Sequence, residues 1–146
     1  MPERSDLEGA GEKVRVRETL AAAEAASRAA DERFWDDRRP RDFALIERLY
    51  GRALVLYIEV HGPAHPMVAW MLDRLGYVCH AQGLLDEAET YYLRSLSAWK
   101  QSGTPMSARV ELTMLNLAVV YDVTGRDRLG EAILAHYDPT WKRAGR

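Results

Sequence analysis

The stretch that decides the fold is Leu75 to Leu96, LGYVCHAQGLLDEAETYYLRSL. Each of its halves carries apolar residues at helical spacing, and a polar segment with Gly83 separates them. A glycine just beyond the end of a helix favours the left-handed backbone that reverses the chain. The stretch therefore predicts two helices joined by a tight turn at Gly83.

Small residues lie at set places within this predicted hairpin. Gly76 falls in the middle of the first helix, where glycine costs about 1 kcal/mol relative to alanine. That cost is tolerated where a neighbouring helix approaches closely, and Ala88 offers a matching small surface on the second helix. Tyr91, Tyr92 and Leu96 then fill the space between hairpins. We expect a hairpin that cannot bury its apolar face alone and stacks on copies of itself.

A shift of 42 residues repeats the pattern in both directions along the chain. The matching pairs are, downstream, Leu75 with Leu117, Gly76 with Ala118 and Gly83 with Gly125 and, upstream, Tyr92 with Tyr50, Leu96 with Leu54 and Trp99 with Tyr57. One period shared by three places is stronger evidence for a repeat than any single match.

The rest of the chain fits a series of helices. No window shows the alternation of a strand, so the sequence predicts an all-α protein of antiparallel helices with short connections. Pro2, Gly9 and Gly11 make residues 1–12 an expected disordered segment. Residues 13–146 are expected to form one helical-repeat domain. Its predicted hairpins are 14–60, 66–102 and 105–138, with helices over 14–35, 43–60, 67–82, 85–101, 106–124 and 127–137.

The central hairpin resembles the tetratricopeptide repeat, which has small residues on both helices, an aromatic late in the second helix and a proline between units. The 42-residue spacing and the segment TMLNLAVVYDVTGR, residues 113–126, are more similar to the kinesin-light-chain type of this repeat. The resemblance covers Asp42 to about Tyr137 and implies a short right-handed α-solenoid. The chain departs from the family pattern at Cys79, where an aromatic is usual, and at Gly130, where the last unit should have alanine.

Composition excludes several classes of partner. The chain has 146 residues, a net charge of −2 and a pI near 6.1, which gives no general attraction to nucleic acids or anionic membranes. The longest apolar runs, such as Ala53 to Val60, are too short to span a bilayer. Charges occupy the N-terminal region where a signal peptide needs apolar residues. We therefore expect a cytoplasmic protein that binds neither nucleic acid nor membrane.

No metal or nucleophilic site is predicted. His61 and His65 flank glycine and proline in EVHGPAHP, which prevents the helical spacing of a zinc site, and a loop between repeats is the better interpretation. Cys79 and His80 are adjacent, so on a helix they point about 100° apart and a packed thiol is favoured over a catalytic one. Because Cys79 is the one cysteine, an internal disulfide is excluded. The sequence indicates no enzyme and no cofactor.

Charged residues cluster in the segment DDRRPRD, residues 36–42. Paired carboxylates at Asp36 and Asp37 could act as an acid and a base, and the neighbouring arginines could bind nucleic acid. Opposite charges lie side by side, however, so a solvated loop is the favoured interpretation.

The remaining candidate is a surface. In a stack of this kind the first helices of the units line a concave face, and we expect the partner-binding groove there. The candidate residues are Trp70, Asp73, Arg74, Tyr77 and His80 from one unit and Leu112, Leu115, Asn116, Val119 and Asp122 from the next. The resemblance implies that Asn116 reaches the main chain of a bound extended peptide and that Arg74 can hold a carboxylate. An ion pair within the helix or a solvated side chain is an equal alternative for Arg74. Glu89 is expected on the solvated outer face.

Two functional hypotheses follow. The first is a non-enzymatic module that binds a peptide or protein segment on the concave face. The alternative is a structural domain that forms a homo-oligomer or docks on a larger partner through an uncapped apolar end. The second hypothesis rests on the expectation that no full capping helix follows Tyr137. Only a short segment remains there, in which Trp141 is the candidate anchor.

Overall fold

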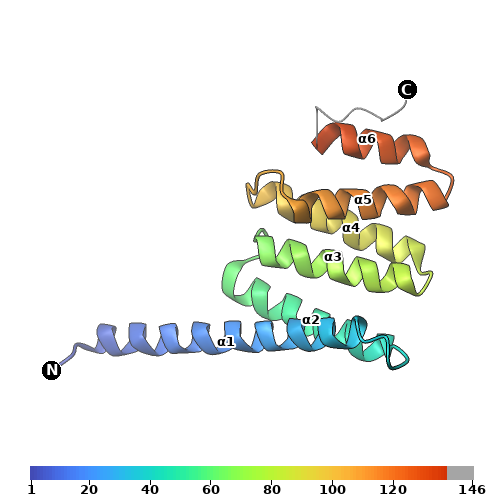
Figure 1. Ribbon diagram of the computed structural model, residues 1–146. Coiled ribbons are helices and arrows are strands. Elements are labelled where there is room, and N and C mark those ends of the chain that lie inside the picture. The colour runs from blue at the N-terminus through green and yellow to red at the C-terminus, as the bar shows by residue number, and fades with distance from the viewer. Residues whose placement is uncertain (138–146) are drawn as a thin grey trace. The chain divides into compact units, whose positions relative to one another are not determined.

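The computed structural model describes residues 1–137 of the chain, and every element in that part is an α-helix (Figure 1). The fold class predicted from the sequence, all-α with antiparallel helical hairpins, is confirmed. The packing groups the residues into two compact units, Met1–Pro63 and Ala64–Arg146. The single repeat domain predicted over residues 13–146 stays a prediction.

The first unit is a hairpin of α1, Arg4–Phe34, and α2, Phe43–His61. Alanines spaced three to four residues apart give α1 a narrow buried seam that continues to Phe34, and α2 packs larger side chains against it. The buried residues are Ala23, Ala26, Ala30 and Phe34 on α1 and Ile46, Tyr50, Ala53, Leu54 and Tyr57 on α2. The Tyr50 hydroxyl donates a hydrogen bond to Asp31 and so ties the two helices together.

Helix α1 begins ten residues before the predicted helix, at Arg4 in place of Val14, so the segment expected to be disordered is helical from residue 4. The Glu3 amide donates to the Asp6 carboxylate at 3.2 Å, which satisfies one of the polar groups that flank a helix start. Glutamate, lysine and arginine are strong helix formers, and they outweigh the cost of Gly9 and Gly11. Residues 4–18 are exposed on every side.

The second unit contains α3 (Pro66–Ala81), α4 (Leu85–Gln101), α5 (Ala108–Val123) and α6 (Asp127–Tyr137). Each helix packs on the next, and α3 also contacts α5 (Figure 1). Helix α5 begins two residues later than predicted, because the Ser107 side chain caps it by accepting from the Val110 amide. The end of the predicted hairpin 105–138 and the candidate anchor Trp141 lie outside the described residues.

The small residues have the places that the repeat predicts. Gly83 and Gly125 have φ values of 79° and 75°, so both reverse the chain with a left-handed backbone. A Cβ added at Gly76 would lie 2.8 Å from the Tyr92 ring, so α4 approaches α3 closely at Gly76 through Tyr92 and not through the expected Ala88. A Cβ added at Gly130 would lie 3.3 Å from the Ala118 backbone, so α5 and α6 meet through two small residues.

Candidate partner-binding face

A buried ion pair lies at the centre of the predicted groove. Asp73 and Arg74 of α3 are 0% and 7% exposed. The Arg74 Nη2 and Nε atoms donate to Asp73 Oδ2 at 2.6 and 3.1 Å. From α5, Asn116 Nδ2 donates to Asp73 Oδ1 at 3.4 Å. The Asp73 carboxylate therefore receives hydrogen bonds from two helices, and the Arg74 charge is neutralised within the chain.

Aromatic rings surround the same guanidinium. The Arg74 side chain lies 4.3 Å from the centre of the Trp70 ring and 5.2 Å from that of Tyr77. A second guanidinium, that of Arg109 on α5, lies 4.5 Å from the centre of the Trp70 ring. Its Nη1 atom is 4.0 Å from the sulfur of Met67. Such contacts are worth about 0.5–2 kcal/mol each, depending on burial. Trp70 thus connects α3 to α5.

Eight of the ten predicted groove residues fall into two sets in the structure. Trp70, Asp73, Arg74 and Asn116 come together through the contacts above. The other set lies along α5, where Leu112, Leu115 and Val119 are 37%, 51% and 47% exposed and Asp122 is exposed as well. Tyr77 and His80, both half-buried, meet edge to face with their ring centres 6.4 Å apart, and His80 Nδ1 is buried without a hydrogen-bond partner in the described chain.

A groove of about 270 Å³ lies between α5 and α6. We call it the α5–α6 groove, and its lining residues are Leu115, Ala118, Val119 and Asp122 from α5 and Asp127, Gly130, Glu131 and Leu134 from α6. Three of the predicted residues line it, namely Leu115, Val119 and Asp122. The sequence prediction missed the α6 side and also Arg109, because it considered only the first helix of each unit and placed Arg109 nowhere.

Glu89 is not on a solvated outer face, so that expectation is wrong. Its two carboxylate oxygens accept from Arg126, with Nη2 2.6 Å from Oε2 and Nη1 3.2 Å from Oε1. Arg126 also lies 4.8 Å from the Tyr121 ring centre. Burial raises the pKa of the Tyr121 phenol, and the Glu89 carboxylate adds to that effect. The ion pair between Glu89 and Arg126 links α4 to the turn between α5 and α6.

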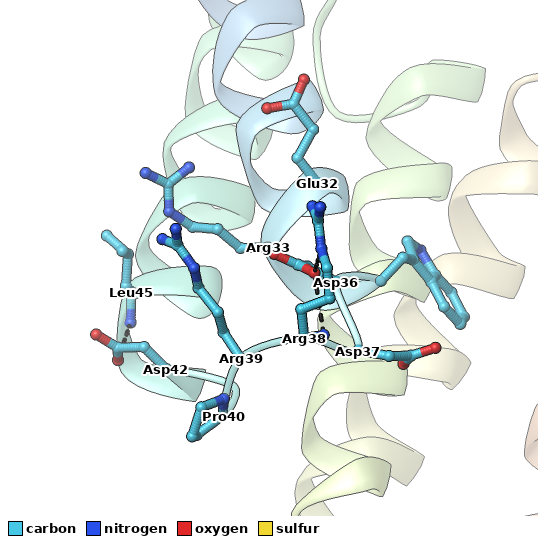
Figure 2. A pocket seen from close by; sticks show the side chains of 10 residues that line it. Glu32, Arg33, Asp36, Asp37, Arg38, Arg39, Pro40, Asp42 and Leu45 are labelled. Atoms are coloured by element: carbon cyan, nitrogen blue, oxygen red, sulfur yellow. Dashed lines mark hydrogen bonds and ion pairs between the residues drawn. The ribbon is translucent and has the colours of Figure 1, made fainter.

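The larger cavity, of about 870 Å³, lies at the turn between α1 and α2 (Figure 2). Figure 2 shows arginines and carboxylates interleaved around it. Arg38 Nε donates to Asp36 Oδ1 at 2.9 Å, and this bond lowers the pKa of the Asp36 carboxyl group. The lining contains the carboxylates Glu32, Asp36, Asp37 and Asp42 and the arginines Arg33, Arg38 and Arg39. The charges nearly balance, which supports a solvated loop over an anion-binding or acid–base site.

Two residues that the sequence offered for chemistry, His65 and Cys79, have structural roles in the fold. His65 Nδ1 accepts from the Met67 amide at 3.1 Å and so caps the start of α3. The Cys79 thiol is buried. Within residues 1–137 as described, no three histidine, cysteine, aspartate or glutamate side chains are grouped so that they could hold a metal ion.

None of the described helices has the length and low charge that a bilayer span requires.

The family comparison matches the helices that form the candidate face. A search of curated proteins found no match. A family model of the tetratricopeptide repeat matches residues 39–101, which contain α2 to α4, and residues 68–136, which contain most of α3 to α6. Such repeats are generally protein–protein interaction modules and typically non-enzymatic scaffolds. With more than half of its residues matched, the chain belongs to the tetratricopeptide repeat family.

Proposed function

We propose that this chain is a non-enzymatic module that binds a peptide or protein segment on the face formed by α3 and α5. The observation that carries the proposal is the exposed apolar stripe of α5, formed by Leu112, Leu115 and Val119 at 37%, 51% and 47% exposure. Exposed apolar side chains gathered on one stripe, with polar groups beside them, are typical of interaction surfaces. We call this stripe together with Asn116 the partner face.

Asn116 supplies the polar groups next to the stripe. Its amide can donate two hydrogen bonds and accept two, and the contact with Asp73 uses one donor. The remaining donor and the carbonyl oxygen can meet the main chain of an extended segment. Arg74 serves this interaction indirectly, since it holds the carboxylate that orients Asn116.

Capture of the natural partner tests the proposal. The chain is used to pull proteins from the native cell extract, and the captured partner is then titrated. Asn116→Ala should weaken binding by about 1 kcal/mol, or roughly fivefold, while circular dichroism stays helical. Leu115→Ser should weaken it further, because the change removes apolar contact area.

Thr90→Ala provides the control, because Thr90 is exposed on α4 and its hydroxyl donates a hydrogen bond to the Asp86 carbonyl within the same helix. Equal capture by the native chain, Asn116→Ala and Leu115→Ser would show that the partner uses another surface.

Self-association is the second candidate function. The α5–α6 groove and Leu129 of α6, which is 48% exposed, leave apolar surface at this end of the second unit. A second copy could cover it in a closed or an open assembly. Size-exclusion chromatography with light scattering tests the idea over a range of protein concentrations, and a strict monomer throughout would rule it out.

A further inference from the structure

The α5–α6 groove has a counterpart one repeat earlier in the chain. Each of its eight lining residues maps, by the 42-residue shift, onto a residue of the α3–α4 hairpin. In chain order the pairs are Leu115 with Asp73, Ala118 with Gly76, Val119 with Tyr77, Asp122 with His80, Asp127 with Leu85, Gly130 with Ala88, Glu131 with Glu89 and Leu134 with Tyr92.

On the earlier hairpin, α5 and the turn after it lie against this surface. Asn116 of α5 reaches Asp73, and Arg126 of the turn reaches Glu89. Helix α5 packs against both α4 and α3. The occupant of the counterpart surface is thus a helix of 16 residues with a cation just beyond its end. Within the described part of the chain, the residues that line the α5–α6 groove come from α5 and α6.

The chemistry of the groove differs from that of its counterpart in two ways. Leu115 stands in place of Asp73, Val119 in place of Tyr77 and Leu134 in place of Tyr92, so these lining positions are more apolar. Asp122 stands in place of His80 and Asp127 in place of Leu85, so the groove is also more acidic, and among the described residues its lining includes no lysine or arginine. An occupant with an apolar stripe and flanking cations would complement both features.

We propose that the α5–α6 groove binds an amphipathic helix of a partner protein, which has an aliphatic stripe flanked by lysine or arginine and docks as α5 docks on the hairpin before it. The inference rests on the proposed function in that Leu115 and Val119 belong to the partner face. It adds the secondary structure and the charge of the partner. Helices that place aliphatic residues three and four apart into such a groove are a recurring mode of recognition.

Two synthetic helical peptides test the proposal on the full chain. They share one leucine stripe and differ only in their flanking positions, which are lysine in one peptide and glutamate in the other. Fluorescence anisotropy should show that the lysine peptide binds about tenfold more tightly than the glutamate peptide, and that this preference shrinks as salt is added.

Two valines of α5 make a matched pair of variants. Val119 lines the groove and Val123 does not, while both are exposed, at 47% and 64%. Val119→Lys should weaken binding of the lysine peptide about tenfold or more, because it adds a bulky cation to the groove. Val123→Lys should leave the affinity within about twofold. Asp122→Asn should reduce both the affinity and its dependence on salt.

Each contrary result overturns the proposal. Equal binding of the two peptides would remove the cationic requirement, and equal effects of Val119→Lys and Val123→Lys would place the binding elsewhere. Self-association of the chain that Val119→Lys abolishes would assign the groove to a second copy. The peptides are defined probes, whereas the extract capture depends on the natural partner. Peptide binding that Val119→Lys weakens can therefore be observed even if the extract capture fails, so failure of the proposed function stays distinct from failure of this inference.

Discussion

At the scale of single residues, the centre of the candidate site is the buried pair of Asp73 and Arg74. The sequence placed both residues on the correct helix and left open whether Arg74 would bind a partner or form an ion pair within the helix. The structure shows an ion pair, but between adjacent residues, with Asn116 joining from α5. Helical spacing could not reveal this, because neighbours in sequence point apart on a helix and only the long arginine side chain turns back.

Arg74→Ala should destabilise the fold strongly. It would leave the Asp73 carboxylate, which is 0% exposed, with one hydrogen bond of 3.4 Å from Asn116. Removing one partner of a buried ion pair typically costs about 3–5 kcal/mol, and urea unfolding followed by circular dichroism would measure it.

The double variant Asp73→Ala with Arg74→Ala should lose less than the sum of the single variants, since it leaves no buried charge unpaired. Arg109→Ala is the control, because Arg109 is exposed and touches the same Trp70 ring. A midpoint for Arg74→Ala equal to that of the Arg109 variant would show that the pair is not buried as described.

The Tyr92 hydroxyl predicts a specific dependence on pH. The side chain is 0% exposed, and its hydroxyl has no hydrogen-bond partner in the described chain. Burial raises the pKa of this phenol, and the Asp73 carboxylate raises it further. The phenol therefore stays neutral in the folded chain while it ionises in the unfolded chain near pH 10. Its contribution to stability is complete below about pH 10 and is lost as the pH rises above that value.

Tyr92→Phe removes this titration. At pH 7 the variant should differ from the native chain by at most about 1 kcal/mol, since the hydroxyl makes no bond that would be lost. Above about pH 10 the native chain should lose stability faster than the variant. Parallel unfolding midpoints from pH 7 to pH 11 would contradict the burial of this hydroxyl.

At the scale of helices, the sequence succeeded wherever a repeat constrained it. The apolar spacing and the breaks at glycine and proline placed the bounds of α3 to α6 within two residues. It failed at the start of α1, which has no counterpart elsewhere in the chain. It also missed the pairing of Glu89 with Arg126, because an ion pair between residues 37 positions apart leaves no periodic signal.

The Glu89–Arg126 pair predicts a measurable coupling between α4 and the turn that precedes α6. The Glu89 and Arg126 side chains are 20% and 37% exposed, so solvent screens them in part, and we expect a small favourable coupling free energy from a double-mutant cycle. The charge-swapped variant, Glu89→Arg with Arg126→Glu, should recover part of the stability that each single reversal loses.

A matched cycle at Asp36 and Arg38 gives the comparison, because the Arg38 side chain is 89% exposed and both residues belong to one loop. That coupling should be smaller. Coupling of zero at Glu89 and Arg126 in low salt would mean that the observed geometry contributes nothing to stability.

At the scale of the whole molecule, membership of the repeat family explains the helical architecture but does not identify a partner. A repeat scaffold hosts many different ligands, so the specificity of such a protein comes from the residues on its surface and not from the fold. The sequence predicted that Leu112, Leu115 and Val119 share one face of α5, and all three side chains are exposed there. It could not identify the α5–α6 groove, because a groove depends on how two helices pack and not on either alone.

The first half of α1 should contribute little to the stability of the folded chain. Residues 4–18 are exposed, including Leu7 at 60% and Val14 at 50%, and the buried seam of α1 starts at Ala23. A helical segment of this length is marginal in water without packing. Hydrogen exchange should therefore be much faster at the amides of residues 4–18 than at those of α3, where ten residues from Val68 to Cys79 are buried. Deleting residues 2–15 should change the free energy of unfolding by less than about 0.5 kcal/mol. A loss above about 1 kcal/mol, or slow exchange at Leu7 and Val14, would show that this half of α1 is packed against another surface in solution.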